Sequence, residues 1–102
     1  MIILILTIQI NNDICTTYFP IKFVHLDLVK QSISDIKFAQ EALNKKSLSN
    51  IVNEMTTEET ILSWKVKESI LGFVRMFNID TKKDIDIVSI KVGEINKTLN
   101  LW

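Results

Sequence analysis

His25 and Asp27 are the only pair of side chains in this sequence that resembles acid–base machinery. Residues two apart on a strand share a face, so an imidazole and a carboxylate at this spacing could meet and move a proton. Together with Tyr18 they would define a small enzyme or ligand-binding domain around a pocket at the end of a sheet. No nucleophile stands near the pair, and the simpler interpretation is that Asp27 caps a helix while His25 packs at a strand–helix junction.

Cys15 is the single cysteine of the chain. A catalytic cysteine needs an activating base and an electropositive setting, and its neighbours Ile14 and Thr16 supply neither. The sequence therefore predicts a small, half-buried hydrophobe on a plain sheet face, opposite the first strand near Gln9 or Ile10.

Metal and cofactor sites find little support in the sequence. One cysteine and one histidine cannot build a zinc site within one chain. Glu54 and Glu58 have the spacing to share a metal only if one helix spans them, and we expect a helix break at Thr56 between them. Two distant glycines cannot form a phosphate loop. We expect no metal and no cofactor.

Lysine and arginine side chains offer one route to nucleic acid. Five residues could form a basic face: Lys65, Lys67, Arg75, Lys82 and Lys83. Twelve basic residues are balanced by twelve acidic ones, however, and a dedicated duplex binder normally carries a basic excess. Nucleic-acid binding is therefore an alternative that this composition does not favour.

Tryptophan and arginine are enriched at interface hot spots, which draws attention to Trp64, Arg75 and Trp102. Trp64 lies off the main apolar stripe of a predicted helix, and Leu71 and Val74 continue that side as a second apolar strip. These five residues are our interface candidates. The competing interpretation is that both tryptophans close the ends of one monomeric core.

The elements that must position these residues follow from hydrophobic periodicity. Strands are expected at about 2–10, 14–23, 85–92 and 98–102, the last with a helical turn as alternative, and helices at about 27–45, 48–55 and 57–77. This pattern predicts an α+β fold: a small, mainly antiparallel sheet, made of an N-terminal hairpin and C-terminal strands, with about three helices packed on one face.

Several local signals refine the strands. The first strand carries apolar residues on both faces near its start, which predicts a central strand covered on both sides there. Pro20 cannot donate to a ladder, so the second strand should lie at an edge or be bulged. In the third strand, simple alternation places Val88, Ile90 and Val92 on one face. Gly93 is expected to turn the chain, and the other turns must rely on Asn, Asp, Ser and Thr.

Other signals concern the helix ends. Asp27 is the candidate N-cap of the first helix and Ser47 that of the second. Thr56 and Glu59 read as a capping box that opens the third helix.

Length and composition limit the remaining possibilities. At 102 residues the chain is one domain, and its charge of zero allows self-association. The first apolar run is too short to span a membrane and lacks a cationic leader, so we expect a cytoplasmic protein without a membrane partner. Abundant Ile, Lys and Asn indicate an AT-rich genome, such as that of a virus, a phage or a low-GC bacterium; a viral protein would act in the host cytoplasm.

The sequence thus favours a non-enzymatic interaction protein, an accessory protein that forms a homodimer or binds a larger protein. Its mechanism would be burial of the apolar strip of the third helix or addition of a strand at a sheet edge.

Overall fold

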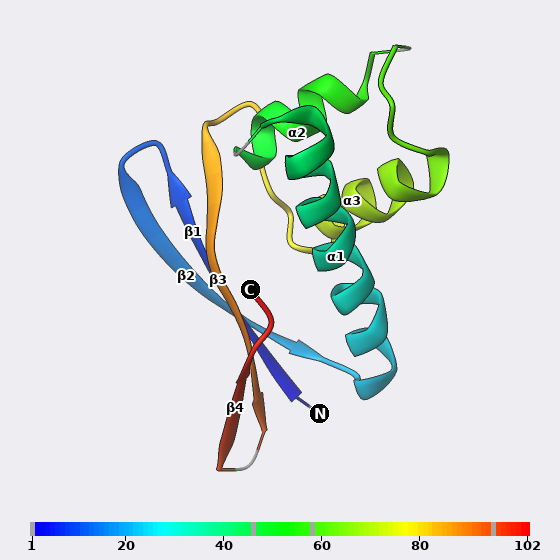
Figure 1. Ribbon diagram of the computed structural model, residues 1–102. Helices are drawn as coiled ribbons and strands as arrows, with labels where there is room; N and C mark the ends of the chain where they lie inside the picture. The colour runs from blue at the N-terminus through cyan, green and yellow to red at the C-terminus, as the bar shows by residue number, and fades with distance from the viewer. Residues whose placement is uncertain (1, 46, 58, 95) are drawn as a thin grey trace.

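A computed structural model describes residues 2–45, 47–57, 59–94 and 96–102. These residues form one antiparallel sheet with strand order β2-β1-β3-β4, and helices cover one of its faces (Figure 1). The elements are β1 (Ile2–Ile10), β2 (Asp13–Ile21), the 3₁₀ turn η1 (Phe23–His25), α1 (Leu26–Leu43), α2 (Leu48–Met55), α3 (Trp64–Met76), β3 (Ile85–Glu94) and β4 (Lys97–Asn100). The predicted α+β fold class, with an N-terminal hairpin and C-terminal strands in one sheet, is confirmed.

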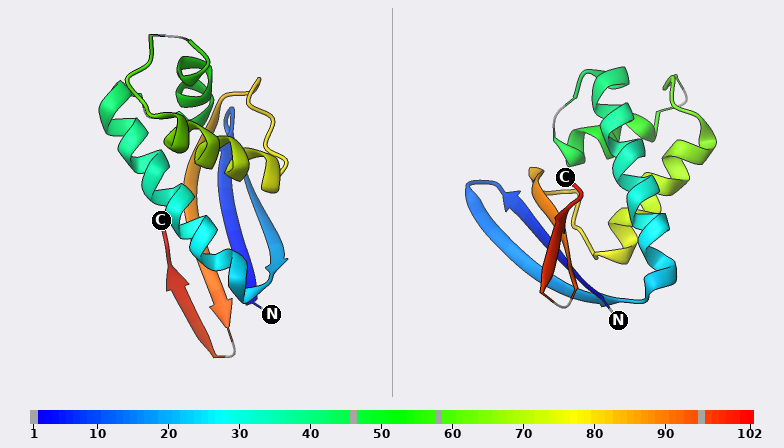
Figure 2. Two further views of the ribbon diagram at one scale, coloured as in Figure 1. Left: turned by 90° about the vertical axis from the view of Figure 1, so that its right-hand side faces the viewer. Right: turned by 60° about the horizontal axis from the view of Figure 1, so that its bottom comes forward.

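Strand β1 lies at the centre of the sheet and buries every second side chain under the helices. Leu4 is fully buried and Leu6 nearly so, whereas Ile3, on the other face, is 38% exposed. Figure 2 shows why: the helices lie on one side of the sheet and leave the other side open. The expectation that β1 is covered on both faces at its start is therefore wrong.

Strand β3 departs from simple alternation at Val88. Thr7 pairs with Ser89 and Ile8 with Ile87, so the register shifts and Val88 has no partner in β1. Such a bulge moves the residues before it to the opposite face. Val88 is consequently 46% exposed. The predicted grouping of Val88 with Ile90 and Val92 is wrong.

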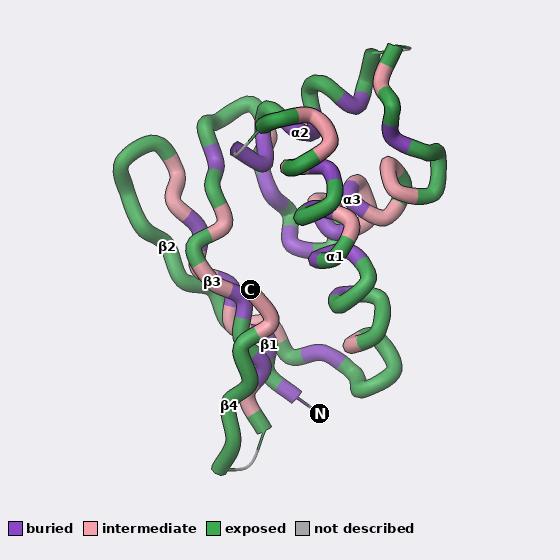
Figure 3. Tube along the Cα trace, viewed as in Figure 1, coloured by how far each residue is buried: buried purple, intermediate pink, exposed green. Residues whose placement is uncertain are grey.

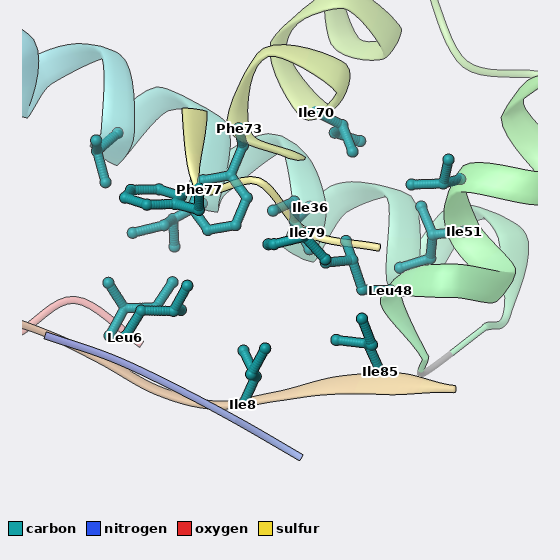
Figure 4. Close-up of a cluster of buried hydrophobic side chains, with 14 of the residues drawn as sticks. Leu6, Ile8, Ile36, Leu48, Ile51, Ile70, Phe73, Phe77, Ile79 and Ile85 are labelled. Atoms are coloured by element: carbon teal, nitrogen blue, oxygen red, sulfur yellow. The ribbon is translucent and has the colours of Figure 1, made fainter. Parts of the chain in front are cut away.

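The core lies between the sheet and the three described helices (Figure 4). Phe77 is central to it: its ring meets Phe73 of α3 and Phe19 of β2 edge to face, each with a centroid separation of 4.7 Å. Ile36 of α1 and Ile51 of α2 are fully buried in the same cluster. The aromatic contacts tie the end of α3 to the edge strand.

Helix α3 begins later than its sequence suggested. The Ser63 side chain caps it by accepting a hydrogen bond from the Val66 amide at 3.3 Å. Thr56 instead ends α2, where its hydroxyl donates to the Asn53 carbonyl at 2.7 Å. The predicted capping box of Thr56 and Glu59 is therefore wrong, because the described residues between α2 and α3 are not helical.

The other two N-termini also differ in detail from expectation. Asp27 lies inside the first turn of α1, whose N-cap residue is His25. Ser47 does occupy the N-cap position of α2, but its hydroxyl bonds to the chain that leads into β3 instead of capping.

Asparagine provides the left-handed turns of this glycine-poor chain. Among the described residues other than glycine, those with a positive φ are all asparagines, and their φ values lie between 51° and 59°: Asn11, Asn44, Asn78 and Asn96. Asparagine tolerates this conformation better than other side chains. Gly93, by contrast, lies inside β3 and does not turn the chain, which corrects the prediction made for it.

Asn44 ends α1 with φ 53°, and its amide donates to carbonyls of the last helical turn. We expect Asn44→Ala to lower the free energy of unfolding by about 1 kcal/mol, because alanine is strained at positive φ. Asn44→Gly should retain or slightly raise stability. Urea unfolding of both variants measures the difference, and equal stabilities would contradict it.

The C-terminal tail runs back beside β3. Strand β4 pairs with β3 from Lys91 to Glu94, and the Leu101 and Trp102 amides both donate to the Ile90 carbonyl, at 2.7 and 3.1 Å. A fourth strand is thus present, although it is shorter and starts earlier than predicted.

Candidate functional site

A cleft of about 450 Å³ opens where the end of β2 approaches α1 and α3. Its lining comes from three parts of the chain: Phe19, Pro20, Ile21 and Lys22 from β2 and its end, His25 and Leu28 from the start of α1, and Met76 and Phe77 from the end of α3. Leu28 is 58% exposed and Met76 43% exposed, so the cleft presents apolar surface to solvent. Its volume lies within the range of binding pockets.

Lys22 and His25 supply the side-chain nitrogen atoms among the lining residues, and both residues are exposed. They lie where the chain leaves the sheet and enters α1 through η1. An apolar cleft with two nitrogen donors at its rim suits an apolar group that ends in a carboxylate.

The cleft adjoins the long outer edge of β2. Because β2 is the last strand on its side of the sheet, half of its backbone groups have no partner strand. In Figure 3 the strand is exposed along most of its length. The opposite edge, β4, is only four residues long.

Pro20 shows which backbone groups face outward. It is opposite Ile3, and because proline has no N–H this must be a non-hydrogen-bonded pair with β1. Hydrogen-bonded and non-hydrogen-bonded pairs alternate along an antiparallel ladder. Ile14, Thr16 and Tyr18 therefore form non-hydrogen-bonded pairs with β1, as Pro20 does, and direct their N–H and C=O groups to the open edge. The prediction that Pro20 marks an edge strand is confirmed.

Natural proteins usually protect such an edge with charges, prolines, bulges or a short strand. After Asp13, β2 has only one of these devices, Pro20, which lies near its end. Between Asp13 and Lys22, β2 has no charged residue, and its ladder with β1 has no register shift. Ile14 and Tyr18 are 67% and 65% exposed on the open face of the sheet. The edge of β2 is therefore suited to accept another strand.

The acid–base constellation is not assembled. His25 and Asp27 are both exposed at the start of α1, and only His25 lines the cleft. Tyr18 projects from the sheet face opposite the helices, since it pairs with Ile5. The pocket at the sheet's end exists, but of these three residues it contains His25 alone.

Cys15 is exposed and lies opposite Ile8. The prediction of half burial is wrong, and its partner Ile8 is the neighbour of the predicted Gln9. Cys15 lies near the β1–β2 hairpin, which projects away from the helices (Figure 1).

The five interface candidates lie in different environments. Trp64 is 73% exposed at the start of α3, whereas Leu71 and Val74 are half-buried against the core. Arg75 is exposed, 3.9 Å from the Glu68 carboxylate. Trp102 is also half-buried, with the Lys37 ammonium 5.3 Å from its ring centroid. The structure therefore does not join them into one patch.

The five basic candidates are also spread out. Lys65 and Lys67 lie about 200° apart around α3, at 100° per residue. Arg75 lies next to Glu68. Lys82 and Lys83 follow Asp80, whose carboxylate accepts from the Lys82 amide at 3.0 Å. No single basic face results among them.

The described part of the chain offers neither a cluster of metal ligands nor a membrane-spanning helix. Within it, no three His, Cys, Asp or Glu side chains come together as metal ligands, and no helix is long and apolar enough to cross a bilayer. Glu58, one member of the predicted carboxylate pair, lies outside the described residues.

Sequence reasoning missed most of the lining of the cleft, because that lining comes from three separate segments. The available signal was the segment from Tyr18 to Leu28, in which four large side chains are exposed: Tyr18, Phe23, Val24 and Leu28. In comparisons with known proteins, the chain matches no family model, no curated protein and no solved structure.

Proposed function

We propose that this chain is a protein-interaction module that forms a homodimer by pairing the β2 edges of two copies. The observation that carries the proposal is the long edge of β2, which has no charged residue between Asp13 and Lys22 and no bulge in its ladder with β1. Strand addition at such an edge gains main-chain hydrogen bonds and is a recurrent mode of protein recognition. It would extend the sheet of each copy into one continuous sheet.

Three further features support a second copy as the occupant. A closed two-fold interface uses the same surface on both chains, and an antiparallel pair of identical strands satisfies that symmetry. The chain has a formal charge of zero, so two copies do not repel each other strongly. Ile14 and Tyr18 supply exposed apolar side chains beside the edge, which backbone pairing alone would lack.

We expect wild-type protein to reach the dimer mass with rising concentration in light scattering, and Thr16→Pro to remain monomeric. Proline at position 16 removes an N–H that faces the open edge and leaves the ladder with β1 intact. Circular dichroism checks that the variant is folded.

Trp64→Ala is the matched control because Trp64 is the most exposed tryptophan and lies on α3, away from β2. It should dimerise like the wild type. A wild-type monomer at every concentration would contradict the proposal. Dissociation by Trp64→Ala with an unaffected Thr16→Pro would place the interface on α3 instead.

A further inference from the structure

We infer the register of this dimer, an inference that rests on the proposed function: the two β2 strands pair antiparallel about a two-fold axis at Thr17. Each Asp13 then lies opposite Ile21 of the other copy, at the rim of the cleft that Lys22 and His25 mark. The cleft and the edge thereby form one self-complementary site.

Symmetry limits the registers to a few. A two-fold axis perpendicular to the sheet keeps the helices of both copies on one side, so residues opposite each other must face the same side of the sheet. The outward-directed residues Ile14, Thr16 and Tyr18 must pair among themselves or with Pro20. The axis can consequently pass through Thr16 or Thr17, whereas an axis at Tyr18 would place Ile14 opposite Lys22, beyond the end of the strand. Each of these choices places Asp13 differently.

Charge decides among these registers. With the axis at Thr16, Asp13 lies opposite Phe19 and presses its carboxylate against the apolar part of the cleft, which is costly. With the axis at Tyr18, Asp13 passes beyond the end of the other strand, which ends at Ile21. Only the axis at Thr17 brings Asp13 to the Lys22 end of β2.

The same register also suits the neighbouring side chains. Cys15 falls opposite Phe19, on the helix side of the sheet, so a small apolar group enters the cleft. Thr16 falls opposite Tyr18, and their backbones exchange hydrogen bonds because both face the edge. Pro20 falls opposite Ile14, where its carbonyl still accepts from the Ile14 amide.

Disulfide trapping tests the register directly, because it reports which residues of the two copies lie opposite each other. In a Cys15→Ser background, Thr17→Cys should form an interchain disulfide under mild oxidation. The two copies of residue 17 would be a non-hydrogen-bonded pair with Cα atoms about 4.5 Å apart, within disulfide range. Thr16→Cys in the same background should not be trapped, because the two copies of residue 16 would not be opposite each other.

Charge exchange tests the role of Asp13. Asp13→Lys and Lys22→Asp should each weaken the dimer about tenfold at low salt, since each replaces two symmetry-related attractive pairs by like charges. The double variant should recover most of the wild-type affinity, and 1 M NaCl should remove the differences. Analytical ultracentrifugation measures the four dissociation constants.

The outcomes separate this inference from the proposed function. A dimer that is trapped at residue 16 and not at residue 17, or a double variant as weak as the single ones, overturns the register and leaves the homodimer intact. A wild-type chain that is monomeric overturns both.

Discussion

Phe73→Ala is expected to lower the free energy of unfolding by about 3–5 kcal/mol. Phe73 is 1% exposed and lies between α3 and the sheet, with its ring edge to face against Phe77. Removing the ring leaves a cavity, and it also removes an aromatic contact worth about 0.5–1.5 kcal/mol. The gain in helix propensity from alanine, roughly 0.5 kcal/mol, offsets only a small part.

Phe38→Ala is the matched control because Phe38 is also a helical phenylalanine but is 55% exposed on α1. Its stability should stay within about 0.5 kcal/mol of the wild type. Urea unfolding followed by circular dichroism measures both variants, at one protein concentration because dimerisation would link stability to concentration. Similar losses in the two variants would show that the Phe73–Phe77 contact is not central to the core.

The parts of the fold that depend on residue type and short-range periodicity could be predicted from the sequence. The bounds of β1 agree with the prediction because its apolar alternation is continuous from Ile2 to Ile10. Pro20 correctly marked an edge strand because proline lacks the donor that a central strand needs. The scarcity of glycine correctly indicated that asparagine would form turns.

The errors arose where tertiary contacts override local pattern. The bulge at Val88 is set by pairing with β1, and no single residue in the sequence indicates its position. Thr56 and Glu59 match a capping box, yet Leu62 is buried outside the helix and Ser63 provides the cap. A capping motif identifies a possible helix start, while packing selects the one that is used.

The candidate site was the least predictable part. The edge position of β2 was foreseen, because β2 contains proline. Most of the lining of the cleft was not, because Leu28 and Met76 come together only through the packing of α1 on α3. Exposed apolar residues near Pro20 are visible in the sequence, but their exposure is not.

Ser49→Ala is expected to lower the free energy of unfolding by about 1–3 kcal/mol, because it leaves buried backbone groups without partners. The Ser49 hydroxyl donates to the Lys83 carbonyl and accepts from the Ile85 amide, the latter at 2.9 Å. Ser49 is 5% exposed, so water cannot readily replace these bonds. The hydroxyl thus connects α2 to the start of β3.

Hydrogen exchange makes this second stability prediction specific to its mechanism. In Ser49→Ala the Ile85 amide should lose more protection than the amides of β1, because its own acceptor is gone. Ser34→Ala, on the exposed side of α1, is the control and should change neither stability nor exchange appreciably. If Ser49→Ala loses stability while Ile85 remains as protected as β1, the loss comes from α2 itself. The buried serine would then not be what joins this helix to the sheet.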